Sequence, residues 1–352
     1  LPWVKYHIYC CIFLIPKFTL FAGDCSPIVL SLFRKNDPFL NVLLIILLVI
    51  VRLLYTFLGD LNLQTTSGTQ SYLLNEVFSL SLNAYGHIWF SAVFVMINML
   101  LINQLIRSNQ AFDENNYLGG LTYLLLSNSA IPFFQLSGSL VASTCLLLAL
   151  SLILHHVKQR ASEENIFFTG VLIGLSVLFY SPLAIFLPLT LLVYVFYTRT
   201  IPRRYVLATF GFCFPFIVTY SISLYGAKTF PLSFFFENLF SRSIAEDNLL
   251  SFFFVLVPLL LMMSKLLGSF NGLKMTNHQI HFHRIMFLLF LSAIYLFFAA
   301  GQTFGLVWVL SIPATYFICK SLLAMQRPWV RNTVFFLLLC ELSYPYLSAA
   351  YF

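Results

Sequence analysis

Long apolar runs recur along this chain. Residues 39–58, FLNVLLIILLVIVRLLYTFL, are one example, and within this run Arg52 is the only charged residue. A helix needs about 20 mostly apolar residues to cross the hydrocarbon core of a bilayer. Charged residues make up 9 % of the chain, against about 25 % in soluble domains. A water-soluble core could not cover this much apolar surface, so the sequence predicts an all-α, polytopic helical bundle in a membrane.

Eleven spans are predicted from these runs, and one pair of them is ambiguous. The YSPLA segment inside residues 166–198 contains a Ser-Pro step, which disfavours a continuous helix. This pair is either two short spans with a tight turn or a re-entrant pair. The full set of predicted spans is 39–58, 86–106, 117–135, 138–155, 166–181, 183–198, 205–224, 249–267, 285–300, 303–320 and 332–351.

Lysine and arginine predict the orientation, because they collect in the cytoplasmic loops of membrane proteins. If the N-terminal end of the first span is cytoplasmic, fourteen basic residues fall on that side, and only Lys228 and Arg242 fall on the other. The C-terminus is then expected outside. The net charge of +7 therefore reflects topology, and no nucleic-acid partner is expected.

The chain is predicted to form one transmembrane helical domain over residues 31–352. Residues 1–30 are interpreted as an over-extended start or a signal-like segment, because a short apolar run there precedes AGDCSP. Two connections on the outer face are long enough to carry function, and they cover residues 59–85 and 225–248.

Arg52 and Glu341 are the two charges that lie clearly inside predicted spans. An arginine there is costly and normally faces a partner or a water-filled cavity, and its planar guanidinium suits phosphate oxygens. Arg52 is thus a candidate contact for a lipid phosphate, or else a side chain that snorkels to the outer surface. Counted from the inner membrane surface, the two residues differ in depth by roughly 6 Å, so Glu341 is a candidate ion-pair partner of Arg52.

Two acids in the first outer loop are candidates for catalysis. Asp60 directly follows the first span, where a carboxylate could act as a general base at the membrane surface. The alternative is an exposed loop acid after a turn at Gly59. Glu76 is a secondary candidate in the same loop.

The histidines and cysteines define no metal site in the sequence. His278, His281 and His283 could ligate a transition metal, but Lys274 and Arg284 beside them favour a solvated basic loop. The seven cysteines have no CxxC or framework spacing, so neither a disulfide nor a metal is inferred. The chain contains no P-loop, GxGxxG, HExxH or GxSxG motif, and no cofactor is expected.

Residues 31–250 resemble the GT-C glycosyltransferases, which use lipid-linked sugars: a basic end, a span and a long outer loop that opens with Asp60 come first, and residues 167–225 are similar to the central region of that class. A helix rich in small residues, the Ser-Pro break, a return helix, the basic turn TRTIPRR and a glycine-containing helix follow one another. The resemblance implies a polyprenyl-phosphate sugar donor, a reaction at the outer face, Asp60 as the base and Arg52 as a phosphate contact. The chain also resembles bacterial inner-membrane proteins of no assigned activity, which implies a multi-pass protein of that membrane.

Two other functions remain open. A permease or flippase for an amphipathic substrate would use the Ser-Pro break and the polar segment SNSAIPFFQLSGS, residues 127–139, to line a path. A non-catalytic membrane subunit would dock a protein partner through its apolar outer loops. Membrane lipids are expected partners under every one of these functions.

Overall fold

The computed structural model describes residue 33, residues 37–58, 84–112, 116–129, 134–159, 162–198, 202–225, 277–299 and 304–324, and residues 331, 332, 335 and 338. Every regular element in this part of the chain is helical. In chain order the elements are α3 (Phe39–Leu58), α5 (Ala84–Ser108), α6 (Leu118–Leu126), α7 (Gly138–Gln159), α8 (Glu163–Phe179), the 3₁₀ helix η2 (Ser181–Ile185), α9 (Phe186–Val193), the π-helix η3 (Tyr194–Thr198), α10 (Pro202–Tyr225), α13 (Asn277–Ala299) and α14 (Phe304–Ala324).

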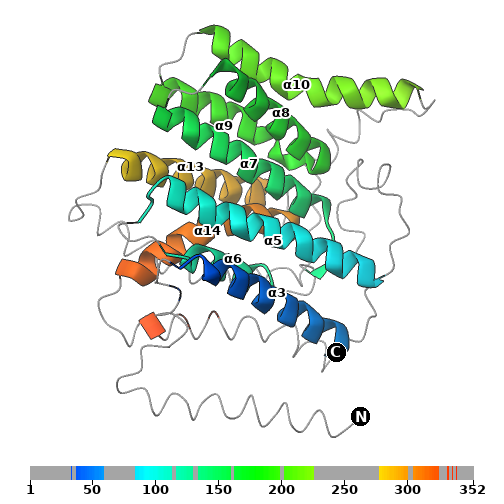
Figure 1. Cartoon of the computed structure of the whole chain (residues 1–352). Helices are drawn as coiled ribbons and strands as arrows, with labels where there is room; N and C mark the ends of the chain where they lie inside the picture. Colours follow the sequence, from blue (N-terminus) through cyan, green and yellow to red (C-terminus); the bar gives the residue numbers. More distant parts are fainter. Residues whose placement is uncertain are drawn as a thin grey trace, which may run out of the picture.

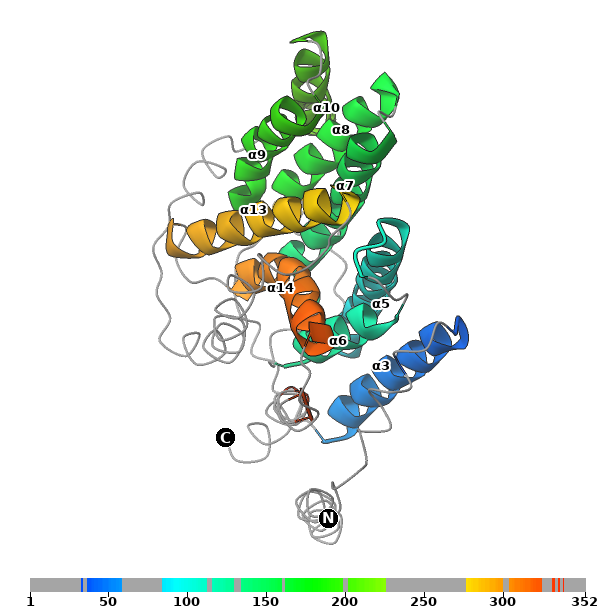
Figure 2. The ribbon, with the colours of Figure 1, turned by 90° about the vertical axis from the view of Figure 1, so that its left-hand side faces the viewer.

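Six of these helices, α3, α5, α7, α10, α13 and α14, are long and apolar enough to cross a membrane. The all-helical class predicted from the apolar runs is therefore confirmed for the described residues, and the six helices are compatible with the predicted membrane location. The helices form a bundle with α3 at one edge and α10 at the other (Figures 1 and 2). In its most apolar window α14 is 94 % buried inside the protein, whereas α10 is 22 % buried. A helix that is covered on all sides belongs to the centre of a bundle, so α14 is the central helix.

Close packing of glycines joins α8 to α10. Gly170 and Gly174 lie four residues apart on α8, and a Cβ atom at these positions would overlap the carbonyl oxygens of Ala208 and Phe212 on α10. Gly211 on α10 has the same relation to the carbonyl oxygen of Phe167. Small residues at this spacing let two membrane helices approach backbone to backbone. The close approach explains why this pair of helices has glycines at the contact.

Substitution of Gly174 by leucine is expected to destabilise the protein by about 1–3 kcal/mol, because the larger side chain overpacks the contact with α10. The midpoint of thermal unfolding of the purified protein in detergent measures the effect. Val206→Leu is the matched control, since Val206 is 68 % exposed on the outer side of α10. Equal midpoints for the two variants would contradict the tight α8–α10 contact.

Polar contacts bring together the helix ends that carry most of the described basic residues. Lys158 at the end of α7 donates to the carbonyl oxygen of Ser108 at the end of α5 over 2.9 Å. Arg204 at the start of α10 lies 3.8 Å from Glu163 at the start of α8. We call this the basic end of the bundle. We call the opposite end of the bundle the far end. There the start of α14 packs closely against the residue that follows α8, since a Cβ atom on Gly305 would lie 2.9 Å from the ring of Tyr180.

The structure corrects three predicted elements. The expected continuous helix over residues 117–135 is interrupted, because α6 ends at Leu126. The stretch over 183–198 is divided into η2, α9 and η3, with Pro182 in the first turn of η2. Helix α13 begins at Asn277 rather than near 285. The predicted span 249–267, most of 332–351, and residues 1–30 lie outside the described residues.

The side chains that follow α6 explain why it stops inside the bundle. Ser127 and Asn128 both donate to the carbonyl oxygen of Leu124, over 3.0 and 2.7 Å, and Ser129 donates to that of Leu126 over 2.9 Å. Side-chain donors that bond back to nearby carbonyls compete with the continuation of a helix. The result is a half-length helix whose end is buried among its neighbours.

Candidate functional site

Arg52 is fully buried in the protein, at 0 % exposure. The carbon atom of its guanidinium lies 4.4 Å from the ring centroid of Phe134, which comes from the segment that leads into α7. The Tyr55 ring, one turn further along α3, stacks on Phe134 with centroids 4.0 Å apart. A snorkelling side chain would reach the surface, so the structure excludes that alternative and leaves an arginine inside the bundle.

Helical phase explains the burial of Arg52. Leu40, Leu44 and Leu48 are buried at four-residue intervals along α3, and Arg52 is the next position in this series. Residues at this spacing share one face of a helix, so Arg52 must point where the leucines point. The side chains between them, such as Ile46 and Ile50, are exposed on the outer surface.

A buried hydrogen-bond network lies in the same part of the bundle. The side-chain amide of Asn98 on α5 donates to the hydroxyls of Tyr123 on α6 and Ser143 on α7, over 3.1 Å in each case. Ser311 on α14 also lies beside the Tyr123 hydroxyl, and Tyr123 is within electrostatic range of Arg52. Helices α5, α6, α7 and α14 therefore place polar groups together in the interior, near the buried cation.

The end of α6 contributes a negative potential to this region. Tyr123 and the capped carbonyls that follow it form the C-terminal turn of α6, where the helix dipole is negative. The Asn128 amide group is oriented by its donation to Leu124, and its side-chain oxygen is buried with no hydrogen-bond partner among the described residues. A cation such as the Arg52 guanidinium is favoured near a helix end of this kind.

Asp60, Glu76 and Glu341 lie outside the described residues, so their convergence with Arg52 stays a prediction. No group of three or more His, Cys, Asp or Glu side chains that could hold a metal occurs in the described part of the chain.

Sequence reasoning missed a second polar cluster, which lies at the basic end. The histidine segment 277–284 forms the first turns of α13, and His283 is 3 % exposed, so a solvated loop is wrong for this residue. Its Nδ1 atom lies 3.2 Å from both the Tyr316 hydroxyl and the Lys320 ammonium of α14. The four-residue spacing of Tyr316 and Lys320 places both residues on one face of a helix, but the sequence does not show that this face packs against His283.

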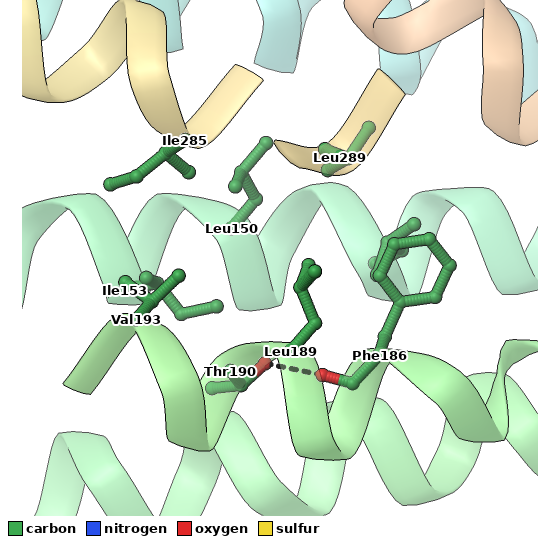
Figure 3. A pocket seen from close by; sticks show the side chains of 9 residues that line it. Leu150, Ile153, Phe186, Leu189, Thr190, Val193, Ile285 and Leu289 are labelled. Atoms are coloured by element: carbon green, nitrogen blue, oxygen red, sulfur yellow. Dashed lines mark hydrogen bonds between the residues drawn. The ribbon is translucent and has the colours of Figure 1, made fainter. Parts of the chain in front are cut away.

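A hollow between α7, α9 and α13 holds about 320 Å³ of empty space, part of it open to the surroundings (Figure 3). The one hydroxyl in its wall belongs to Thr190, which donates to the carbonyl oxygen of Phe186 over 2.7 Å. The hollow therefore offers apolar contact and no free polar group. It is lined by Leu146, Leu150, Ile153, Phe186, Leu189, Thr190, Val193, Ile285 and Leu289.

Comparison with known proteins gives a family without assigned chemistry. No curated protein and no solved structure matches the chain. A family model described as a family of unknown function, DUF6427, matches residues 72–350. This match includes the Asn98–Tyr123 network and the His283–Lys320 pair, and it begins after Arg52 and Asp60. Since it covers most of the 352 residues, the chain belongs to the DUF6427 family.

Proposed function

We propose that this protein binds an anionic, lipid-linked substrate in the membrane and transfers a sugar from it, as a GT-C-like glycosyltransferase. The proposal includes a bacterial inner-membrane location, eleven spans, a cytoplasmic N-terminus and a polyprenyl-phosphate-linked sugar as donor. One observation carries it: Arg52 is an arginine with 0 % exposure inside a bundle of apolar helices. Such a costly group is normally retained for a partner or a substrate pathway, and arginine is suited to phosphate oxygens.

The proposed reaction gives each candidate residue one role. The Asp60 carboxylate takes the proton from an acceptor hydroxyl, whose oxygen attacks the anomeric carbon of the sugar. The bond from that carbon to the phosphate oxygen breaks, and the polyprenyl phosphate leaves with the electron pair. Arg52 stabilises the charge on the leaving phosphate, with Glu341 as the partner of its guanidinium, and Glu76 is a second acid beside the acceptor.

A permease or flippase is the second candidate, and the interrupted helix α6 favours it. Discontinuous helices whose ends lie inside the bundle are typical of transporter binding sites. The buried Asn128 and the break at Ser181–Pro182 are features of this kind. In this function Arg52 would hold the phosphate of an amphipathic substrate while it crosses the membrane, without a chemical step.

Reconstitution of the full-length protein into proteoliposomes distinguishes the candidates. A radiolabelled polyprenyl-phosphate sugar is supplied with a soluble acceptor, and transfer to the acceptor and movement between leaflets are both measured against empty vesicles. Transfer supports the glycosyltransferase, and movement without transfer supports the permease. If neither exceeds the empty vesicles, both proposals are contradicted, and a non-catalytic subunit becomes the better description.

A further inference from the structure

The hollow between α7, α9 and α13 suits hydrocarbon and does not suit water (Figure 3). Its walls are apolar except for Thr190, whose hydroxyl is already bonded to the carbonyl oxygen of Phe186 within α9. A buried water makes about three hydrogen bonds to polar groups, and these walls do not offer them. An empty space would deprive the walls of dispersion contacts. Among helices that cross a membrane, a hydrocarbon chain is the occupant that avoids both costs.

The length and position of the hollow match part of one acyl chain. Leu146, Leu150 and Ile153 of α7 line it, and seven residues of helix rise roughly 10 Å. One leaflet of a bilayer has a hydrocarbon depth of about 15 Å, half of the whole core. Leu146 lies near the middle of α7, and Ile153 lies closer to its basic end. The hollow therefore belongs to the leaflet on the basic side of the bundle.

Polar side chains follow the hollow toward the basic end. His281 precedes the wall residue Ile285 by four residues, so the two share one face of α13. The His281 ring contacts the ring of Tyr197 on η3, with centroids 5.0 Å apart. Its Nδ1 atom is buried and has no hydrogen-bond partner among the described residues. This nitrogen is available to a polar group at the end of the hollow.

Positive charge lies beside this nitrogen. Arg284 follows His281 by three residues, so the two are neighbours on the surface of α13, and Arg284 is exposed. The acids described at this end, Glu163 and Glu164, lie at the start of α8, where Arg204 is 3.8 Å from Glu163. Basic pockets between membrane helices on the cytoplasmic side bind anionic lipid headgroups. The charge at this end of the hollow therefore favours an anionic lipid over a zwitterionic one.

We propose that the hollow binds one acyl chain of an anionic membrane phospholipid, and that His281 and Arg284 contact the phosphate of its headgroup. The guanidinium of Arg284 donates to the phosphate oxygens, and the His281 Nδ1 atom supplies a further hydrogen bond. The chain joins α9 to α7 and α13, so the bound lipid stabilises the bundle. The site uses neither Arg52 nor Asp60, and it is independent of sugar transfer.

Thermal unfolding of the delipidated full-length protein in detergent tests the headgroup. Phosphatidylglycerol is expected to raise the midpoint by about 3 °C or more, because a ligand of the folded state stabilises it. Phosphatidylcholine with the same chains should raise it by less than half as much. Arg284→Gln should remove this difference, and Arg203→Gln should keep it, since Arg203 is exposed at the start of α10 and does not line the hollow. Equal wild-type shifts with the two lipids would overturn the proposal.

Leu150→Phe tests the chain site, because the larger side chain fills the hollow. At least half of the shift produced by phosphatidylglycerol should be lost. Leu148→Phe is the matched control, since Leu148 is 37 % exposed on the same helix, and it should keep the full shift. A full shift in Leu150→Phe would contradict the proposal. So would a larger wild-type shift with polyprenyl phosphate that Leu150→Phe abolishes, because the hollow would then hold the chain of the sugar-transfer substrate.

Photocrosslinking of the wild-type protein does not depend on any variant. A phosphatidylglycerol with a photoreactive diazirine in its acyl chain is irradiated with the protein, and the labelled peptides are identified by mass spectrometry. Label is expected in α9, and unlabelled phosphatidylglycerol should compete with it. Helix α10 is the internal control, because it is only 22 % buried in its most apolar window, and label there should resist competition. If no label in α7, α9 or α13 responds to the competitor, the proposal is wrong.

Discussion

Replacement of Asp60 by asparagine is expected to lower the rate of sugar transfer by about 10²- to 10⁴-fold, the usual contribution of a general base. Asparagine retains the size and polarity of aspartate, but it cannot accept the proton of the acceptor hydroxyl. The rate is measured with saturating donor and acceptor in the proteoliposome assay, so that weakened binding does not contribute.

Asp37→Asn is the matched control for this loss. Asp37 comes just before the start of α3, whereas Asp60 follows the end of this helix in the sequence. The Asp37 carboxylate accepts the backbone N–H of Phe39 over 3.0 Å. Asparagine caps a helix about as well as aspartate, so transfer by the control should match the wild type. An Asp60→Asn protein with wild-type transfer would remove the catalytic base from the proposed reaction.

Replacement of Arg52 by glutamine is expected to weaken the binding of a polyprenyl phosphate by about 10- to 100-fold. This range corresponds to the loss of charged hydrogen bonds of about 1.5–3 kcal/mol. The dissociation constant is measured by titration of the detergent-solubilised protein with the lipid. Arg52 lies in the interior rather than at the rim, so the loss should persist when the salt concentration is raised.

Arg52→Lys separates the charge from the shape of the guanidinium. Lysine keeps the positive charge but loses the planar, two-pronged donor and the stacking on Phe134. Affinity between the wild-type and Arg52→Gln values is expected. If both variants bind the lipid as tightly as the wild type does, Arg52 is a structural side chain of the bundle and the substrate phosphate is bound elsewhere.

The helical membrane class could be predicted because it depends on composition and on the length of the apolar runs. Both are read from the sequence without knowing which helices pack together. The bounds of α3 and α7 agree with the predicted spans 39–58 and 138–155 within a few residues. The break after Leu126 escaped prediction, because the SNS segment is short and the flanking residues are apolar. Only its bonds to the carbonyls of α6 show that serine and asparagine act there as terminators.

The candidate site was predictable in part. The position of Arg52 inside a span singled it out, and its four-residue register with Leu40, Leu44 and Leu48 would also have predicted its burial. The contacts of Asn98 with Tyr123 and Ser143 join residues 25 and 45 positions apart. Pairings of this kind depend on which helices become neighbours, and one sequence carries no signal for that. The same limit applies to His283 and Lys320.

The location of α14 at the centre of the bundle has a consequence for biogenesis. Ribosomes deliver helices in order, and this one emerges after α3, α5, α7 and α10. Until α14 arrives, the faces of α6, α7 and α13 that pack on it have no such cover. A nascent chain that stops before residue 304 would therefore expose these faces, which a quality-control protease could recognise.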